Sequence, residues 1–325
     1  MVPDGASSQP DGSAGPVAST GAEASVAPGA LGIGSGPFFL SDPRSGLDAL
    51  PAYEETLTIA FSGTVDGAPR QWSTTHRFQH TATPAMSMLT IEAGVGVGAP
   101  VEDPVLVAEG SGAMYEQAAA GPCMGRRLDP TRSRLAELEP AAQIPGLMGA
   151  DEAGSESLSG VATKHYRFDG RAILEGAGPQ TTGDVWVAAA DGSVRKYVRS
   201  TTADAGYFGG GMAGTMTWTY GLRELDAATR VALPRACQLD VPVMSGATDL
   251  LVLPTYAGFD TSSTVAQVAA FYKAQLPPAG WAYASTPVTS STQVVLTFKS
   301  GARVLNVIVT AAAAGRRVDL ALVGG

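Results

Sequence analysis

Glycine and proline interrupt this 325-residue chain so often that long helices have little room to form. The chain contains 40 glycines and 22 prolines, which together make up about a fifth of its residues. Glycine costs backbone entropy inside a helix, and proline removes a helical hydrogen-bond donor. Charged residues reach only 16%, compared with roughly 25% in an average soluble domain. The composition therefore predicts short strands joined by tight turns.

The charge balance is acidic, with 30 Asp and Glu residues against 21 Lys and Arg residues. Binding to a nucleic-acid backbone requires a basic surface. No apolar run in the sequence reaches the roughly 20 residues that a membrane-spanning helix needs. We therefore expect no nucleic-acid partner and no integral membrane segment.

Alternating apolar and polar residues predict antiparallel hairpins in the first two thirds of the chain. Residues 53–80 form the clearest hairpin, because alternating runs flank the turn Asp66-Gly67. Residues 157–168 are expected to form one long strand, and residues 93–104 a loop. Further strands are expected at 85–92, 105–109, 113–117, 184–190, 193–202 and 216–225.

Helices are expected to be few. Residues 131–142 are the best candidate before residue 240, with Thr131 as the N-cap residue. A second helix is expected after Thr264, where apolar residues recur at helical spacing until Pro277 and Pro278 end it.

The sign of the charge changes near residue 240, which predicts a domain boundary. Residues 37–240 carry 24 acidic and 16 basic residues, whereas residues 241–325 carry 3 acidic and 5 basic residues. After the boundary, the predicted helix precedes strands at 281–288, 292–299, 303–311 and 316–323. We therefore predict an α+β module in which one helix packs on three or four antiparallel strands.

Residues 1–36 have a composition typical of a flexible tether. They contain no Lys or Arg, and 25 of the 36 are Gly, Ala, Ser or Pro. Such a segment buries too little apolar area to offset the entropy of ordering. One interpretation is that a signal sequence and a lipid-bearing cysteine have been removed from a membrane-anchored protein. The alternative is an ordinary disordered terminus.

The two cysteines, Cys123 and Cys237, do not form a CxxC motif and have no metal-ligand spacing around them. An even number of cysteines in a chain that resembles an exported protein favours one disulfide bond. The alternative is a pair of buried free thiols. We expect no metal site.

Catalytic motifs are absent from the sequence. No serine has glycine at both the −2 and +2 positions, and no GxxxxGK[ST] motif occurs. His76 and His80 lie four residues apart on a predicted strand, about 13 Å from each other, and His165 is isolated. We therefore expect no enzyme activity and no cofactor. A hydrolase would require convergent carboxylates or a histidine–acid pair in one cleft.

Several short segments carry a resemblance to a known family. They are GLDALPAY at 46–53, FSGT at 61–64, GVATKHYRF at 160–168, GDVWVA at 183–188, VRKYV at 194–198, WTY at 218–220 and LPRAC at 233–237. In this order, residues 38–240 resemble the LolA/LppX-like lipoproteins of bacterial envelopes, in particular those of Chloroflexi-type bacteria. Residues 268–281 resemble a signature of small modules appended to similar lipoproteins.

The resemblance implies a curved antiparallel half-barrel with helices on its concave side and an apolar cavity for acyl chains. The residues expected to line that cavity are Leu57, Ile59, Phe61, Trp72, Phe78, Met86, Met88, Ile91, Trp186, Met216, Trp218 and Tyr220. Composition alone favours an ordinary filled core for the same residues. The leading hypothesis is an extracytoplasmic, membrane-anchored, monomeric lipoprotein that binds a lipid or other hydrophobic molecule. The alternative is a surface interaction module with a filled core.

Overall fold

The computed structural model describes residues 37–324, except 101–102, 130, 132–134 and 313–314. The expected tether at 1–36 lies outside these residues. The described chain folds into two antiparallel sheets, one of twelve strands and one of six.

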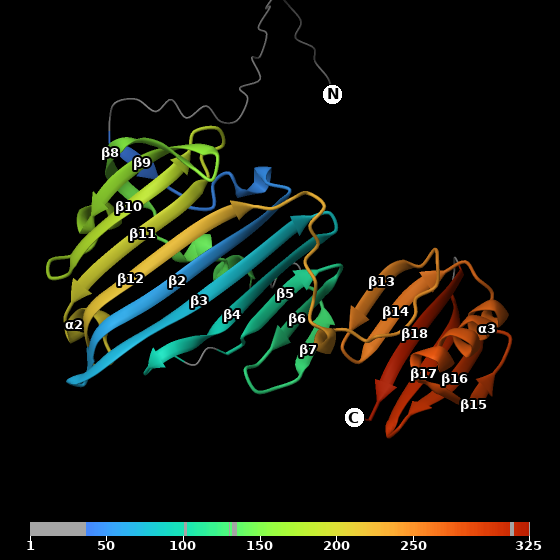
Figure 1. Cartoon of the computed structure of the whole chain (residues 1–325). Helices are drawn as coiled ribbons and strands as arrows, with labels where there is room; N and C mark the ends of the chain where they lie inside the picture. The colour runs from blue at the N-terminus through green and yellow to red at the C-terminus, as the bar shows by residue number, and fades with distance from the viewer. Residues whose placement is uncertain (1–36, 101–102, 130, 132–134, 313–314, 325) are drawn as a thin grey trace, which may run out of the picture. The chain divides into compact units, whose positions relative to one another are not determined.

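The first sheet is open and curved (Figure 1). Its strand order is β1-β8-β9-β10-β11-β12-β2-β3-β4-β5-β6-β7, and every pair is antiparallel. This confirms the predicted curved antiparallel sheet. The strands are β1 Phe38–Leu40, β2 Ala52–Val65, β3 Ala68–Ala82, β4 Ala85–Val97, β5 Leu106–Gly110, β6 Ala113–Gln117, β7 Cys123–Arg127, β8 Leu147–Leu158, β9 Val161–Asp169, β10 Gln180–Ala188, β11 Val194–Ala203 and β12 Met212–Glu224.

The two faces of the first sheet have different surroundings. We call the face that carries Leu57 the inner face, because short helical segments cover it, and the opposite face the outer face. Some of the covering segments (green) lie behind β2 and β3 in Figure 1, and others lie near the ends of the strands. They include η1 Leu47–Ala49, α1 Leu135–Leu138, η3 Pro140–Gln143, η4 Gly170–Ile173 and α2 Ala205–Phe208.

The main core lies between the inner face and these covering segments. Leu57, Leu89 and Tyr197 are completely buried there. Leu47, Leu135 and Ile144 join the same cluster from the covering side. Because each covering segment is only three or four residues long, tertiary packing rather than helix propensity must hold it in place.

The helix expected at 131–142 is much shorter in the structure. The α-helical part ends at Leu138, and a 3-10 turn begins at Pro140. Proline has no N–H to continue the helical hydrogen-bond pattern, which explains the break. Residues 132–134, where the predicted helix would begin, lie outside the described residues.

Two strand predictions also differ from the structure. The expected strand at 157–168 is divided by a turn at Ser159 and Gly160, whose φ angles are 51° and 86°. The residues before the turn belong to β8 and those after it to β9. Strand β4 continues to Val97, where a loop was expected from residue 93.

The second sheet has the order β13-β14-β18-β17-β16-β15. Its six strands exceed the three or four predicted, because β13 and β14 precede the helix. The helix begins with a capping box between Thr264 and Gln267 and packs on β16 and β17. The elements are β13 Thr248–Leu253, β14 Tyr256–Thr261, α3 Val265–Gln275, η6 Pro277–Ala279, β15 Ala282–Thr289, β16 Gln293–Ser300, β17 Arg303–Ala312 and β18 Gly315–Val323.

A disulfide bond joins Cys123 of β7 to Cys237 in the turn η5 Arg235–Cys237, which confirms the predicted pairing. Nearby, the Tyr115 hydroxyl on β6 donates a hydrogen bond to the carbonyl oxygen of Val252 on β13. Buried residues of β5 and β6 share a cluster with Leu251. The described residues thus form one compact unit, and the domain boundary near residue 240 stays a prediction.

Candidate functional site

A continuous band of side chains crosses the inner face. Residues directly opposite each other on antiparallel strands project from the same face. The strand registers therefore place seven residues in one row from β9 to β4, all with at most 8% of their surface exposed. The row is Tyr166, Val185, Tyr197, Tyr220, Leu57, His76 and Ile91.

A second row runs parallel to this band, two residues further along each strand. It consists of Phe168, Gly183, Arg199, Trp218, Ile59 and Thr74. The Phe168 ring lies directly over Gly183, where an added Cβ would come within 2.1 Å of the ring. The guanidinium carbon of Arg199 lies 3.5 Å from the centroid of the Trp218 ring.

The second row and its neighbours are less completely covered than the first. Ile59, Arg199, Met216 and Trp218 are half-buried, whereas Leu57 and Tyr220 are at most 1% exposed. We call these four half-buried residues the Trp218 zone. Its side chains keep surface that is available to another molecule.

Nine of the twelve predicted lining residues lie on the inner face. They are Leu57, Ile59, Phe61, Trp72, Phe78, Ile91, Met216, Trp218 and Tyr220. Phe61 and Trp72 stand opposite each other with their ring centroids 5.8 Å apart, and Phe208 of α2 approaches Phe61 edge-on.

The other three predicted lining residues, Met86, Met88 and Trp186, project from the outer face, which corrects the expectation of a shared face. Met88 lies opposite Gln79 and packs with the cluster around the disulfide bond. Met86 and Met88 lie at even-numbered positions of β4 and Ile91 at an odd-numbered one. Because successive side chains of a strand project from opposite faces, the two methionines face away from Ile91. Trp186 lies opposite His165 and Lys196, on the outer face.

The outer-face cluster around Trp186 contains a histidine–acid pair. The His165 ring stacks on Trp186 of β10 with a centroid distance of 4.4 Å, and the ammonium group of Lys196 on β11 lies 4.5 Å from the centroid of the Trp186 ring. His165 Nε2 is 2.7 Å from Asp184 Oδ1, and Trp186 donates a hydrogen bond to Glu156. Among the described residues, no hydroxyl or thiol group is hydrogen-bonded to His165. The arrangement therefore links four neighbouring strands, β8 to β11, and among the described residues it has no hydroxyl or thiol nucleophile bonded to the histidine.

A pocket of about 790 Å³ opens at the ends of β2, β3, β4 and β12. Its lining includes outer-face residues such as Gln71 and Thr215 and the exposed Val95 and Val97. Of the twelve predicted lining residues, it includes Phe61 and Trp72. The Trp218 zone does not line this pocket.

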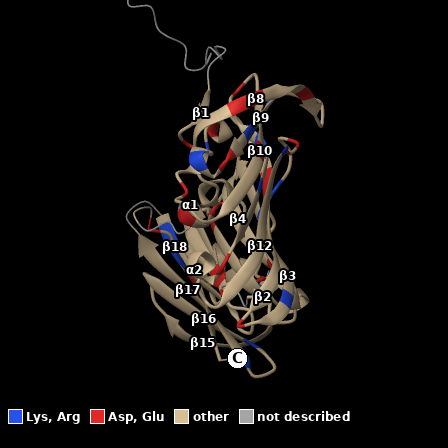
Figure 2. Ribbon diagram, turned by 90° about the vertical axis from the view of Figure 1, so that its left-hand side faces the viewer, with Lys and Arg blue, Asp and Glu red and all other residues tan. Residues whose placement is uncertain are grey.

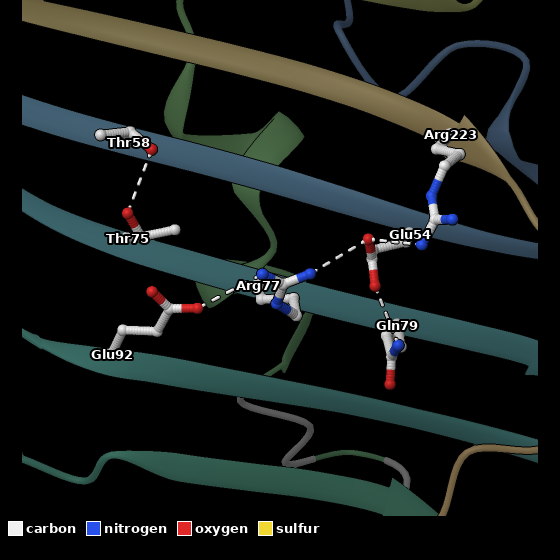
Figure 3. A network of polar contacts seen from close by, with 7 residues as sticks. All are labelled: Glu54, Thr58, Thr75, Arg77, Gln79, Glu92 and Arg223. Atoms are coloured by element: carbon white, nitrogen blue, oxygen red, sulfur yellow. Dashed lines mark hydrogen bonds and ion pairs between the residues drawn. The ribbon is translucent and has the colours of Figure 1, made fainter.

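On the outer face, a network of polar side chains joins β2, β3, β4 and β12 (Figure 3). Glu54 accepts hydrogen bonds from Arg77 at 3.2 Å, Arg223 at 2.9 Å and Gln79 at 2.9 Å. Burial raises the pKa of Glu54, but the bonds from Arg223 and Gln79 outweigh it and leave that pKa below its ordinary value. Arg77 also contacts Glu92.

The inner face holds a buried acidic pair beneath the covering segments. Glu55 accepts a hydrogen bond from the Tyr220 hydroxyl at 2.7 Å, and Glu139 accepts one from Tyr53 at 3.2 Å. Burial, reinforced by the negative charge of Glu139, raises the pKa of Glu55 to about 8. Burial also raises the pKa of Glu139. Glu55 therefore holds its proton to a higher pH than an ordinary glutamate does.

Charged residues are scattered over the ribbon in the side view of Figure 2, where the blue segments are separate from one another. Among the described residues, no group of three or more His, Cys, Asp or Glu side chains has metal-binding geometry. No helix in the described part of the chain is long and apolar enough to cross a membrane.

The fold and the inner face define the class of protein architecture. It is an open, curved antiparallel sheet whose aromatic inner face is covered by short helical segments. Among protein families, a model described as START domain-like matches residues 254–315, within the second sheet. A search of the curated proteins finds no match.

Solved structures with a similar arrangement come from bacteria. LprF from Mycobacterium bovis is 12% identical, with 59% of this chain and 94% of that chain covered and a TM-score of 0.28. The MucA/MucB complex of Pseudomonas aeruginosa is 9% identical, with coverages of 86% and 90% and a TM-score of 0.26. A DUF1329 family protein from Desulfovibrio piger is 10% identical, with coverages of 57% and 89% and a TM-score of 0.20. At these TM-scores, the function has to be argued from the side chains of this chain.

Proposed function

We propose that this protein binds a lipid or another long apolar molecule on the inner face of the first sheet. The observation that carries the proposal is the Trp218 zone, where apolar side chains on the covered face keep part of their surface exposed. Removing such surface from water contributes about 25 cal/mol per Å². Binding of this kind needs no covalent chemistry.

The covering segments limit the part of the inner face that the proposed ligand would occupy. The band formed by Leu57, Tyr197 and Tyr220 is already filled by residues such as Leu135 and Ile144. The Trp218 zone is one step further along the strands, toward Phe61 and its contact with α2. A ligand chain on this zone would lie across β11, β12 and β2, next to the main core.

The proposed setting is the bacterial envelope. The disulfide bond between Cys123 and Cys237 fits an oxidising compartment. The resemblance of residues 38–240 to LolA/LppX-like lipoproteins, including the Chloroflexi type, supports the same setting. A membrane-anchored, monomeric, non-enzymatic lipoprotein with an appended C-terminal module is the finer form of this proposal.

The experiment is native mass spectrometry after purification without detergent, followed by titration with a fluorescent fatty acid. We expect a bound lipid, or saturable uptake of the probe. Ile59→Trp fills the Trp218 zone and should reduce uptake at least about tenfold. The matched control is Thr58→Trp, one residue earlier on the outer face, which should leave uptake unchanged. A lipid-free protein that takes up no probe would exclude the proposal.

The second candidate function is an interaction module with a filled core. The nearly complete burial of Leu57, Tyr166, Tyr197 and Tyr220 favours it. The same titration separates the two functions, because a filled core predicts no uptake by either the unmodified protein or the Thr58→Trp variant.

A further inference from the structure

Arg199 brings a positive charge to the inner face, at the β11 edge of the Trp218 zone. The register places it between Gly183 on β10 and Trp218 on β12. Its guanidinium group stacks on the Trp218 ring at 3.5 Å. This contact orients the cation along the apolar surface that the proposed ligand would occupy.

Arg199 differs in its partners from two other buried or half-buried arginines, Arg195 and Arg317. Arg195 pairs with Asp191 and Glu224, and Arg317 pairs with three aspartates. No ion pair within 4 Å among the described residues includes Arg199, and its buried Nε has no hydrogen-bond partner there. A half-buried guanidinium group without an acid partner is costly unless a ligand supplies one.

Tyr197 supplies a second polar atom beside Arg199. It lies two residues earlier on β11, so its side chain is on the same face. The residue is 0% exposed, and its hydroxyl has no hydrogen-bond partner among the described side chains and backbone groups. Burial raises the pKa of this phenol, against the opposing effect of Arg199. The hydroxyl therefore stays protonated and able to donate a hydrogen bond.

Glu175 adds an acceptor to the same neighbourhood. One carboxylate oxygen accepts a hydrogen bond from the Tyr207 hydroxyl at 2.7 Å, and the other is buried without a partner in the described structure. The charge of Glu175 acts on the Tyr197 hydroxyl together with that of Arg199. Two donors and one acceptor thus lack partners beside the apolar zone.

We propose that Arg199, Tyr197 and Glu175 form the head-group subsite of the ligand, and that the ligand is a phospholipid. Arg199 and Tyr197 donate to its phosphate oxygens, and Glu175 accepts from a hydroxyl or ammonium group on the same head group. The acyl chain lies on Ile59, Met216 and Trp218. A head group that combines an anionic oxygen with a hydrogen-bond donor matches all three unpartnered atoms. This inference rests on the proposed lipid-binding function.

The test compares two lipids that share the same acyl chains. Binding of a phosphatidylethanolamine and of the corresponding diacylglycerol to the full chain is measured by native mass spectrometry. The unmodified protein should prefer the phospholipid by about tenfold or more, because charge-assisted hydrogen bonds are among the strongest polar contacts. Free phosphorylethanolamine should bind far more weakly than the lipid, because it lacks the chain.

Two variants examine the subsite itself. Arg199→Met keeps the apolar stem over Trp218 and removes the charge, and Tyr197→Phe removes only the hydroxyl. Both should abolish most of the preference for the phospholipid and leave diacylglycerol binding intact. The matched control is Arg167→Met on the outer face, where the side chain is 73% exposed, and it should retain the preference. Thermal unfolding of each variant verifies that it is folded.

The outcomes separate this inference from the function on which it rests. If both lipids bind equally to the unmodified protein and to Arg199→Met, the head-group subsite is wrong and lipid binding stands. If neither lipid binds to the folded, unmodified protein, the proposed function fails, and the subsite fails with it. If free phosphorylethanolamine binds as tightly as the lipid, the site recognises a free phosphate compound and the phospholipid assignment is overturned.

Discussion

Glu54 and Glu55 are neighbours on β2, yet their environments are opposite. Glu54 projects from the outer face into a ring of arginine and glutamine donors. Glu55 projects from the inner face, where burial and Glu139 disfavour its charged form. Side chains of the outer face satisfy Glu54, whereas the inner face carries buried polar atoms without a hydrogen-bond partner among the described residues, such as Glu55 Oε2 and the Tyr166 hydroxyl. This difference supports the proposal that the inner face binds another molecule.

The largest expected effect comes from removing apolar bulk on the inner face. Leu57→Ala should lower the free energy of unfolding by about 2–5 kcal/mol, because Leu57 is 0% exposed and its loss leaves a cavity. Thr58→Ala on the outer face should cost about 1 kcal/mol, for its hydrogen bond to Thr75. Urea unfolding measures both. Equal effects would contradict the assignment of faces.

The next largest effect concerns the pH dependence that Glu55 imposes. The folded pKa of Glu55, about 8, lies above its ordinary value of 4.5, so the folded state binds more protons than the unfolded state between these limits. The free energy of unfolding should therefore fall as the pH rises through this window. Glu55→Gln should remove most of this slope and stabilise the protein at pH 8 by on the order of 2 kcal/mol.

Unfolding of both proteins at pH 5 and pH 8 measures the Glu55 effect. The residues that surround Glu55 are Tyr220, Tyr53 and Glu139. A variant that keeps the full pH slope would show that Glu55 is charged in the folded protein.

Glu54 should respond in the opposite direction and less strongly. Its pKa is below the ordinary value in the folded state, so the stability it contributes is present at neutral pH and is lost as the pH falls through the folded pKa. Glu54→Gln should destabilise the protein by about 1 kcal/mol at pH 7, because two of its partners are largely exposed arginines. Denaturation at pH 7 and pH 3 measures this. A stabilising effect at pH 7 would contradict the pairing.

The smallest expected effect is at Trp186. Trp186→Phe removes the hydrogen bond to Glu156 and keeps an aromatic ring between His165 and Lys196. We expect a loss of about 1 kcal/mol or less and unchanged lipid uptake, because Trp186 is on the outer face. Reduced uptake by a folded variant would indicate that the ligand binds on the outer face, which would contradict the proposal.

The sequence predicted the strands that have one apolar and one polar face. The β2–β3 hairpin and the β10–β11 hairpin follow from alternation and Asp-Gly turns. Strand β8 was not predicted, because much of Leu147–Leu158 is exposed and its composition is polar on both sides. Strand β13 was missed because a short run of leucines and valines has no clear alternation.

The candidate site was predicted only in part, because alternation shows that a strand has two faces without showing which faces of different strands coincide. The register between paired strands decides which faces coincide, and it places Trp186, Met86 and Met88 on the outer face. The odd spacing between Met88 and Ile91 was a signal for part of this correction. Arg199 was missed, although its position between Tyr197 and Thr201 in an alternating strand indicates an inward-facing cation.

Photo-crosslinking of a diazirine-labelled fatty acid tests the central claim most directly, because it identifies the residues that the ligand contacts. We predict labelled peptides from β2, β11 and β12, with modifications at Ile59, Met216 and Trp218 on the inner face. Labelling confined to Thr58, Thr217 and Thr219, their outer-face neighbours, would contradict the account, as would a protein that carries no label.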